Sequence, residues 1–191
     1  MSHVLKGDVP MLDLSDFNHI TQESPITYED LTGITAALRE AQQSSHTTQV
    51  GASVVGVSAW NKEVHYRYLG GEYPMSVVED NLVGSKVPCR HHAESLAITM
   101  CARIKDRCTQ DATMYAPWAS CINCAMDIQA AGIQRVVVLN ILMQKTPERW
   151  LTSVEQGLSL LYDHGIRVDV VDTDEGYFGY DIRMDGKVVK V

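Results

Sequence analysis

Two short segments of the chain combine side chains that bind metal ions with one that moves protons. His92 and Glu94 are two positions apart, and Cys121 and Cys124 follow three positions apart from each other. Cysteines at this spacing lie on one face of a helix, so both sulfur atoms can reach one ion. One imidazole and two thiolates suit zinc and leave its fourth tetrahedral position open, as in catalytic zinc sites. The pattern predicts a catalytic Zn²⁺ site at His92, Cys121 and Cys124.

Glu94 is the predicted catalytic residue of this site. Two thiolate ligands neutralise the charge of Zn²⁺, so the metal should acidify a water molecule less than a site with three histidines does. A carboxylate base is then needed, and Glu94 at the first turn of a helix can reach past the metal. It would take a proton from the attacking water and deliver it to the substrate during bond cleavage. The predicted chemistry is zinc-assisted hydrolysis.

The two segments resemble a known zinc signature. His92-Ala93-Glu94 and Cys121-Ile122-Asn123-Cys124 are similar to the signature of the cytidine deaminase superfamily. Further segments are similar to the deoxycytidylate deaminases in particular, and the similarity spans roughly residues 28–171. These segments comprise residues 48–52, 60–61, 113–118, 125–133 and 148–150, and the end of a helix at 165–166. The resemblance implies hydrolysis of the 4-amino group of a deoxycytidine monophosphate, assembly into a homo-oligomer and, in some members, regulation by dCTP and dTTP.

The resemblance assigns a contact with the sugar to Asn61. The other residues expected to bind the nucleotide are Ala93, Trp118, Ala119, Ser120 and His91. His91 stands where related sequences often carry glutamate, and it is either a loop residue or a contact of the substrate phosphate. Ser120 stands where the family usually has proline, and Ala119 where a bulkier residue is common. Small side chains there would leave room beside the base, so the expected substrate is dCMP or a C5-modified dCMP, such as the 5-methyl or 5-hydroxymethyl nucleotide. Trp118 is equally well explained as a core residue, and Asn61 in a turn as a residue chosen for its backbone geometry.

Alternating helical and strand patterns would position these residues. Tyr28, Leu31, Ile34 and Leu38 recur at helical spacing, whereas residues 50–57 form a short apolar run typical of a buried strand. The remaining segments are assigned in the same way. Helices are predicted at residues 27–43, 92–105, 121–131 and 148–164, strands at 50–57, 64–69, 113–118, 136–141 and 167–171, a long loop at 70–90, and a terminal hairpin at 180–191 around Asp185 and Gly186.

This order of elements indicates an α/β fold. Two paired strands come first, and helical crossovers join the later strands. Together with the family resemblance, it predicts a three-layer α/β/α cytidine-deaminase-like sandwich around a mixed five-stranded sheet, with a C-terminal β-hairpin extension. The expected organisation is an N-terminal arm at residues 1–25, a deaminase domain at 26–172 and the hairpin region at 173–191, packed on the same domain.

The composition of the chain limits the classes of molecule that it is expected to bind. The formal net charge of −8 disfavours a nucleic acid polymer, because binding to the phosphate backbone draws on Lys and Arg contacts. A small nucleotide is the expected partner. The sequence contains no apolar run long enough for a membrane span and no charged start followed by an apolar stretch, so we expect a cytoplasmic protein with no membrane contact. An odd number of cysteines does not suggest a secreted disulfide framework.

Two other interpretations stay open at this point. Cys89 could close the fourth position of the metal and make the zinc purely structural, although this gives no reason for Glu94. The chain could also be a non-catalytic zinc-binding scaffold, although all four central residues of the signature are intact. Within the deaminase interpretation, a nucleoside, a free base or guanine could replace the nucleotide as substrate.

Overall fold

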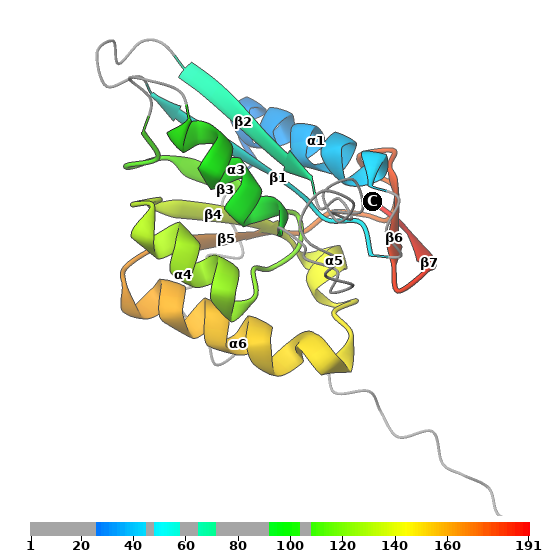
Figure 1. Cartoon of the computed structure of the whole chain (residues 1–191). Helices are drawn as coiled ribbons and strands as arrows, with labels where there is room; N and C mark the ends of the chain where they lie inside the picture. Colours follow the sequence, from blue (N-terminus) through cyan, green and yellow to red (C-terminus); the bar gives the residue numbers. More distant parts are fainter. Residues whose placement is uncertain (1–25, 45–47, 58–64, 72–91, 104–107) are drawn as a thin grey trace, which may run out of the picture.

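The computed structural model describes residues 26–44, 48–57, 65–71, 92–103 and 108–191 (Figure 1). The predicted arm at 1–25, residues 72–90 of the loop predicted at 70–90, Asn61, Cys89 and His91 lie outside these residues. The first two residues of that predicted loop, Gly70 and Gly71, belong to a strand instead. Helices and strands alternate along the described chain. They are α1 (Tyr28–Gln43), β1 (Gly51–Val57), β2 (His65–Gly71), α3 (Ala93–Ala102), β3 (Thr113–Tyr115), α4 (Ile122–Ala130), β4 (Arg135–Leu139), α5 (Asn140–Met143), α6 (Glu148–Asp163), β5 (Arg167–Val171), β6 (Asp181–Met184) and β7 (Lys187–Lys190).

The central sheet is mixed, with the strand order β2-β1-β3-β4-β5. Strand β1 runs antiparallel to both β2 and β3, whereas β3, β4 and β5 run parallel to one another. Parallel neighbours need crossover connections, and α4 and α6 supply them. The end of the parallel strand β3 therefore leads to the start of α4, where the two predicted cysteine ligands lie.

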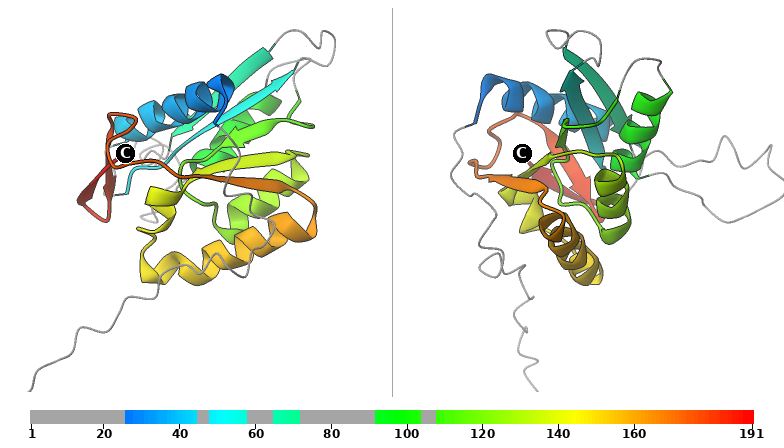
Figure 2. Two further views of the ribbon diagram at one scale, coloured as in Figure 1. Left: turned by 180° about the vertical axis from the view of Figure 1, so that it is seen from behind. Right: turned by 90° about the vertical axis from the view of Figure 1, so that its left-hand side faces the viewer.

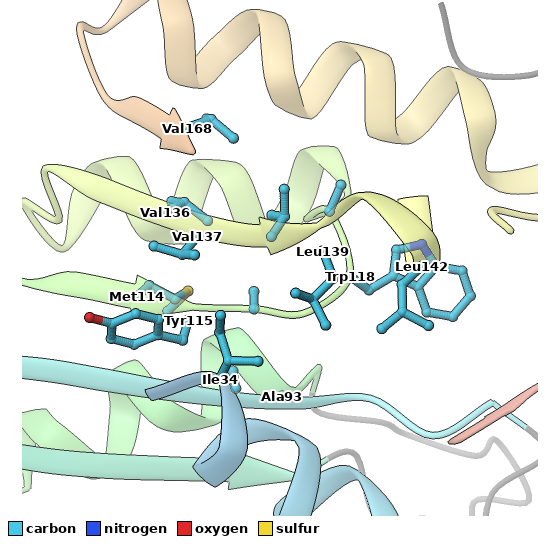
Figure 3. Close-up of a cluster of buried hydrophobic side chains, with 14 of the residues drawn as sticks. Ile34, Ala93, Met114, Tyr115, Trp118, Val136, Val137, Leu139, Leu142 and Val168 are labelled. Atoms are coloured by element: carbon cyan, nitrogen blue, oxygen red, sulfur yellow. The ribbon is translucent and has the colours of Figure 1, made fainter. Parts of the chain in front are cut away.

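Helices cover both faces of this sheet. Figure 2 shows α1 on one side and α3 and α4 on the other, with α6 beside α4. The buried face of α1 includes Ile34 and Leu38, and both belong to the hydrophobic core. Ile34 lies in the same cluster as Met114 and Val137 (Figure 3). The α/β architecture predicted from the sequence is confirmed, with a mixed sheet and a separate hairpin after it.

Two strand predictions were too long. β3 ends at Tyr115 rather than at Trp118, and Pro117, which has no N–H to donate, lies two residues after the end of the strand. The strand predicted at residues 136–141 begins one residue earlier and ends at Leu139, after which the chain turns into the short helix α5. Leu142 and Met143 of that helix are buried. An apolar run does not distinguish a strand from a buried helical turn, which explains the error.

The C-terminal hairpin forms where it was predicted. Strands β6 and β7 pair antiparallel around Asp185 and Gly186, whose φ angles of 49° and 76° are those of a tight hairpin turn. The hairpin is attached to the segment before β1: the Gln49 N–H donates to the carbonyl oxygen of Arg183 at 2.8 Å, and the Arg183 N–H donates to Gln49 Oε1 at 2.9 Å. The hairpin is thus joined to the segment that precedes β1, and β6 also contacts α1.

A buried ionic cluster links α1 to the sheet. Asp30, in the first turn of α1, accepts hydrogen bonds from Arg135 Nη1 at 2.6 Å and from the Tyr115 hydroxyl at 3.1 Å. Arg135 Nε also donates to Asp169 of β5 at 2.7 Å. The side chains of Asp30 and Asp169 are each only 2% exposed, so these bonds compensate for the loss of water around both carboxylates.

None of the helices in the described ranges is both long enough and apolar enough to cross a membrane.

Candidate zinc and active site

Two helix N-termini bring the three predicted metal ligands together. His92 is the N-cap of α3, Cys121 is the N-cap of α4, and Cys124 lies in the first turn of α4. His92 Nδ1 lies 3.5 Å from Cys121 Sγ and 3.3 Å from Cys124 Sγ, and all three ligand atoms are within 4.8 Å of one another. The predicted ligand set is therefore assembled in the fold.

The spacing of these atoms fits a zinc ion. Tetrahedral bonds of about 2.0–2.3 Å place ligand atoms roughly 3.4–3.8 Å apart, close to the separations of His92 Nδ1 from the two sulfur atoms. One imidazole and two thiols are also the donor chemistry that zinc prefers. Among the described residues, this is the one cluster of at least three metal-binding side chains that meets. The arrangement can hold one zinc ion by three protein ligands.

The surroundings of the two cysteines favour a thiolate at Cys121 even without a metal ion. A hydrogen bond from Cys124 lowers the pKa of Cys121, and the imidazole of His92 acts in the same direction. The pKa of Cys124 is raised, because it holds the shared proton and is buried. Both sulfur atoms lie in the first turn of α4, where the helix dipole stabilises negative charge. Metal binding at this pair should therefore release protons.

Glu94 is buried beside these ligands. Its residue is only 4% exposed, and burial raises the pKa of its carboxyl group. Negative charge at Cys121 adds to this rise, whereas its own backbone N–H, His92 and Ser120 oppose it. A buried carboxyl group that accepts a proton easily is suited to shuttle protons within a site closed to bulk water. The placement agrees with the catalytic role predicted for Glu94.

The other predicted contact residues that the structure describes are buried around the site. Ala93, Ala119 and Ser120 are 0%, 6% and 2% exposed. The Ser120 hydroxyl makes no hydrogen bond to any described residue, although it lies close enough to Glu94 to favour its carboxylate form. Such a hydroxyl can receive a polar group of a ligand.

Trp118 has a structural partner that the sequence did not indicate. Its indole N–H donates to Thr146 Oγ1 at 3.0 Å, and the residue is 9% exposed. The polar edge of the ring is thereby used to anchor the segment between β3 and Cys121 to the start of α6. Any contact of Trp118 with a ligand would be made by its apolar ring surface.

Some residues around the ligands were missed by sequence reasoning. Ser95 Oγ lies 3.9 Å from Cys124 Sγ and donates to Asp127 Oδ2 at 2.5 Å, which links α3 to α4 directly behind the metal ligands. Ser95 follows Glu94, and Asp127 follows Cys124 by three positions, so the sequence could have predicted that both residues lie near the site. Their pairing depends on the contact between two helices.

Cys101 and Cys108 do not join the ligand cluster. Cys101 is buried within α3, and Cys108 is exposed beyond it. Neither was predicted to bind the metal.

Comparison with protein families gives a match over residues 28–140, to the family described as the cytidine and deoxycytidylate deaminase zinc-binding region. This range contains all three ligands and Glu94. A search of curated proteins finds no significant match.

Two solved structures of one phage protein were compared with this chain. The dCMP deaminase of cyanophage S-TIM5 in its apo form superposes with a TM-score of 0.52 at 18% sequence identity, covering 75% of this chain and 98% of that one. The same phage protein in complex with dCMP and dUMP gives a TM-score of 0.49 at 19% identity, covering 78% of this chain and 99% of that one. At these identities the first comparison shows a common α/β fold.

Proposed function

Because the chain belongs to the cytidine and deoxycytidylate deaminase zinc-binding family, with a zinc-binding His-Cys-Cys triad, we propose that it hydrolyses the 4-amino group of a deoxycytidine monophosphate. The substrate would be dCMP or a C5-modified dCMP, such as 5-methyl- or 5-hydroxymethyl-dCMP. The products would be the matching deoxyuridylate and ammonia. The observation that carries this proposal is the buried carboxyl group of Glu94 beside His92 and the two cysteines.

Each residue of the site has a defined task in this reaction. His92, Cys121 and Cys124 hold the metal. When bound, zinc supplies the Lewis acidity that turns water into a nucleophile near neutral pH. Glu94 takes one proton from the attacking water and transfers it to ring N3 while the new C4–O bond forms. It then carries the second proton to the amino group, so that the C4–N bond breaks and ammonia leaves.

The substrate contacts are proposed from the residues that surround the base position. Ala93, Ala119 and Ser120 would line the pocket for the base, with the unpaired Ser120 hydroxyl available for a polar group. Trp118 would contribute its apolar ring surface. The contact of Asn61 with the sugar stays a prediction of the family resemblance, and the contact of His91 with the phosphate stays a prediction from the sequence.

Two observations favour a small nucleotide as substrate. The net charge of −8 disfavours binding of a polymer that carries a phosphate at each residue. The cyanophage protein of similar fold is a dCMP deaminase, which makes dCMP the first substrate to test. The small side chains of Ala119 and Ser120 extend the test to C5-substituted bases.

The deciding experiment measures ammonia release by the zinc-loaded protein. The substrates are dCMP, 5-methyl-dCMP, 5-hydroxymethyl-dCMP, CMP, deoxycytidine, cytosine and guanine, with Glu94→Gln as the inactive control. We expect turnover of a deoxycytidine monophosphate that falls at least about 100-fold in Glu94→Gln. Preference for a nucleoside, a base or guanine would reassign the substrate. Zinc binding without ammonia release from any of them would favour the scaffold interpretation.

Assembly and regulation are separate proposals that follow from the family resemblance. We expect a homo-oligomer, tested by light scattering of the eluted protein at several concentrations. Regulation by dCTP or dTTP predicts a change in the substrate dependence of turnover when either nucleotide is added. A monomer at all concentrations, or rates unaffected by both nucleotides, would contradict the respective proposal.

A further inference from the structure

One face of α6 lies along the segments that carry the zinc ligands. Trp150, Ser153 and Gly157 are separated by three and four positions, so they form one row on this helix. The row becomes more exposed toward the start of the helix, where Trp150 is 38% exposed, whereas Gly157 is buried. The α6 helix lies beyond residues 28–140, the range that matches the family.

Each member of the row touches a different part of the metal site. The ring of Trp150 meets the ring of His92 edge to face, with centroids 6.4 Å apart and planes at 77°. Ser153 Oγ accepts the backbone N–H of Ile122 at 3.3 Å. That N–H belongs to the first turn of α4 and has no partner within its own helix, so Ser153 secures the helix start that holds both cysteines.

Gly157 allows α6 to approach the first cysteine closely. A Cβ atom built at Gly157 would lie 2.5 Å from the backbone oxygen of Ser120 and 3.1 Å from the carbonyl carbon of Cys121. A side chain at this position would have to displace the backbone that leads into Cys121. The row therefore contacts His92 at one end and the backbone of Cys121 at the other.

The C-terminal hairpin holds the outer end of this row. Arg149, next to Trp150, forms a two-pronged ion pair with Asp185 in the β6–β7 turn. Asp185 is itself held by Thr48, whose hydroxyl donates to Asp185 Oδ1 at 3.1 Å and accepts the Asp185 N–H at 3.2 Å. The start of α6 is thus tied to the hairpin turn and to the segment before β1.

We propose that α6 and the C-terminal hairpin act as a support for the zinc site, in which Trp150, Ser153 and Gly157 position the ligand segments and Asp185 fixes the row through Arg149. All five are positioning residues. The proposal rests on the zinc triad and not on the identity of the nucleotide. Residues that orient metal ligands typically change metal affinity or activity by about 10- to 100-fold when they are replaced.

Because the Arg149–Asp185 ion pair is exposed, its effect on the zinc site can be tested with little change in overall stability. The Arg149 side chain is 58% exposed and that of Asp185 33%, and an ion pair this accessible adds little to folding. Asp185→Asn removes the charge but keeps a residue that tolerates the positive φ of this turn. Lys190→Ala, on the exposed side of β7, is the matched control within the same hairpin.

The test uses the full chain with cobalt in place of zinc, because cobalt absorption reports the geometry and sulfur ligation of the site. Ser153→Ala is expected to shift the cobalt spectrum and weaken zinc binding about 10-fold in a chelator competition. For Asp185→Asn we expect a smaller shift in the same direction, with an unchanged melting temperature. Arg149→Lys should retain part of the effect of the ion pair, and Lys190→Ala should match the wild type.

The outcomes separate this proposal from the proposed function. Spectra and zinc affinities of Ser153→Ala and Asp185→Asn that equal those of Lys190→Ala would overturn the support. If Asp185→Asn does not fold, Ser153→Ala decides alone. A wild-type protein that releases no ammonia from any substrate, yet shows the expected spectral shifts, would refute the proposed function and leave the support standing.

Discussion

Gly157 of α6 lies against the backbone oxygen of Ser120, which directly precedes the first cysteine ligand. A methyl group at Gly157 would be 2.5 Å from that oxygen, closer than packed atoms allow. Helix and ligand segment would have to move apart. We expect Gly157→Ala to cost about 1–3 kcal/mol of the free energy of unfolding and to weaken zinc binding about 10-fold. Urea unfolding and chelator competition measure the two effects.

Gly165→Ala separates the steric effect from the change in residue type. Gly165 follows α6 with a φ of +70°, and nothing lies within 4 Å of a Cβ built there. This variant should lose about 1 kcal/mol through backbone strain while binding zinc as the wild type does. Equal zinc affinity in both glycine variants would contradict the role assigned to the Gly157 contact.

The zinc content of the protein should depend on Cys121 and not on Cys108. Cys121 is a ligand next to His92, whereas Cys108 is exposed and outside the cluster. Purified wild type and Cys108→Ala are expected to carry about one zinc per chain, and Cys121→Ala close to none. Elemental analysis of dialysed protein gives the numbers, and zinc retained at wild-type affinity in Cys121→Ala would rule out the assigned ligand set.

Trp118 and Thr146 should contribute to stability through the same hydrogen bond. The indole N–H and the Thr146 hydroxyl are 3.0 Å apart and buried. Trp118→Phe keeps an aromatic ring, and Thr146→Val keeps the size of the side chain. Each should lower the free energy of unfolding by about 1–3 kcal/mol, because one buried polar group loses its partner.

A double-mutant cycle tests that pairing. In Trp118→Phe/Thr146→Val both polar groups are gone, so the combined loss should be smaller than the sum of the single losses. Additive losses would mean that the bond contributes nothing. Once a substrate has been identified, its KM can be compared between the wild type and Trp118→Phe. A change of less than about twofold would agree with substrate contact by the ring surface alone.

The buried ionic cluster predicts loss of stability in acid. Burial alone would raise the pKa of Asp30, but hydrogen bonds from Arg135 and Thr27 outweigh it and lower the pKa from 3.8 to about 2. A lowered pKa in the folded state stabilises the protein at pH values above 3.8. That stabilisation, about 2 kcal/mol, is lost as the pH falls from about 4 to 2.

Asp30→Asn should remove the acid dependence that comes from this residue. We expect this variant to have a free energy of unfolding at least about 2 kcal/mol lower than that of the wild type at pH 7. This difference should become smaller as the pH falls below 4. Asp163→Asn, at an exposed position at the end of α6, is the control and should leave unfolding unchanged. Urea unfolding between pH 2.5 and 7 checks both, and a difference independent of pH would contradict the assignment.

Local sequence patterns predicted much of the fold. The period of apolar residues located α1 and α6, the short apolar run at residues 50–57 located β1, and Asp185-Gly186 located the hairpin turn. These signals are local, because helix and strand periodicity and turn conformation depend on neighbouring residues. The α5 helix was missed, since an apolar run that continues past the end of a strand has no local marker of the change.

The metal site could be predicted from the sequence because its functional residues lie in two short segments. The types and spacing of His92, Glu94, Cys121 and Cys124 were enough to predict three zinc ligands and a proton carrier. Only the tertiary structure decided that the starts of α3 and α4 lie together, that Trp118 bonds to Thr146, and that α6 contacts the ligand segments. Those relationships join residues far apart in the chain, and no local pattern specifies which helix faces will meet once the sheet has formed.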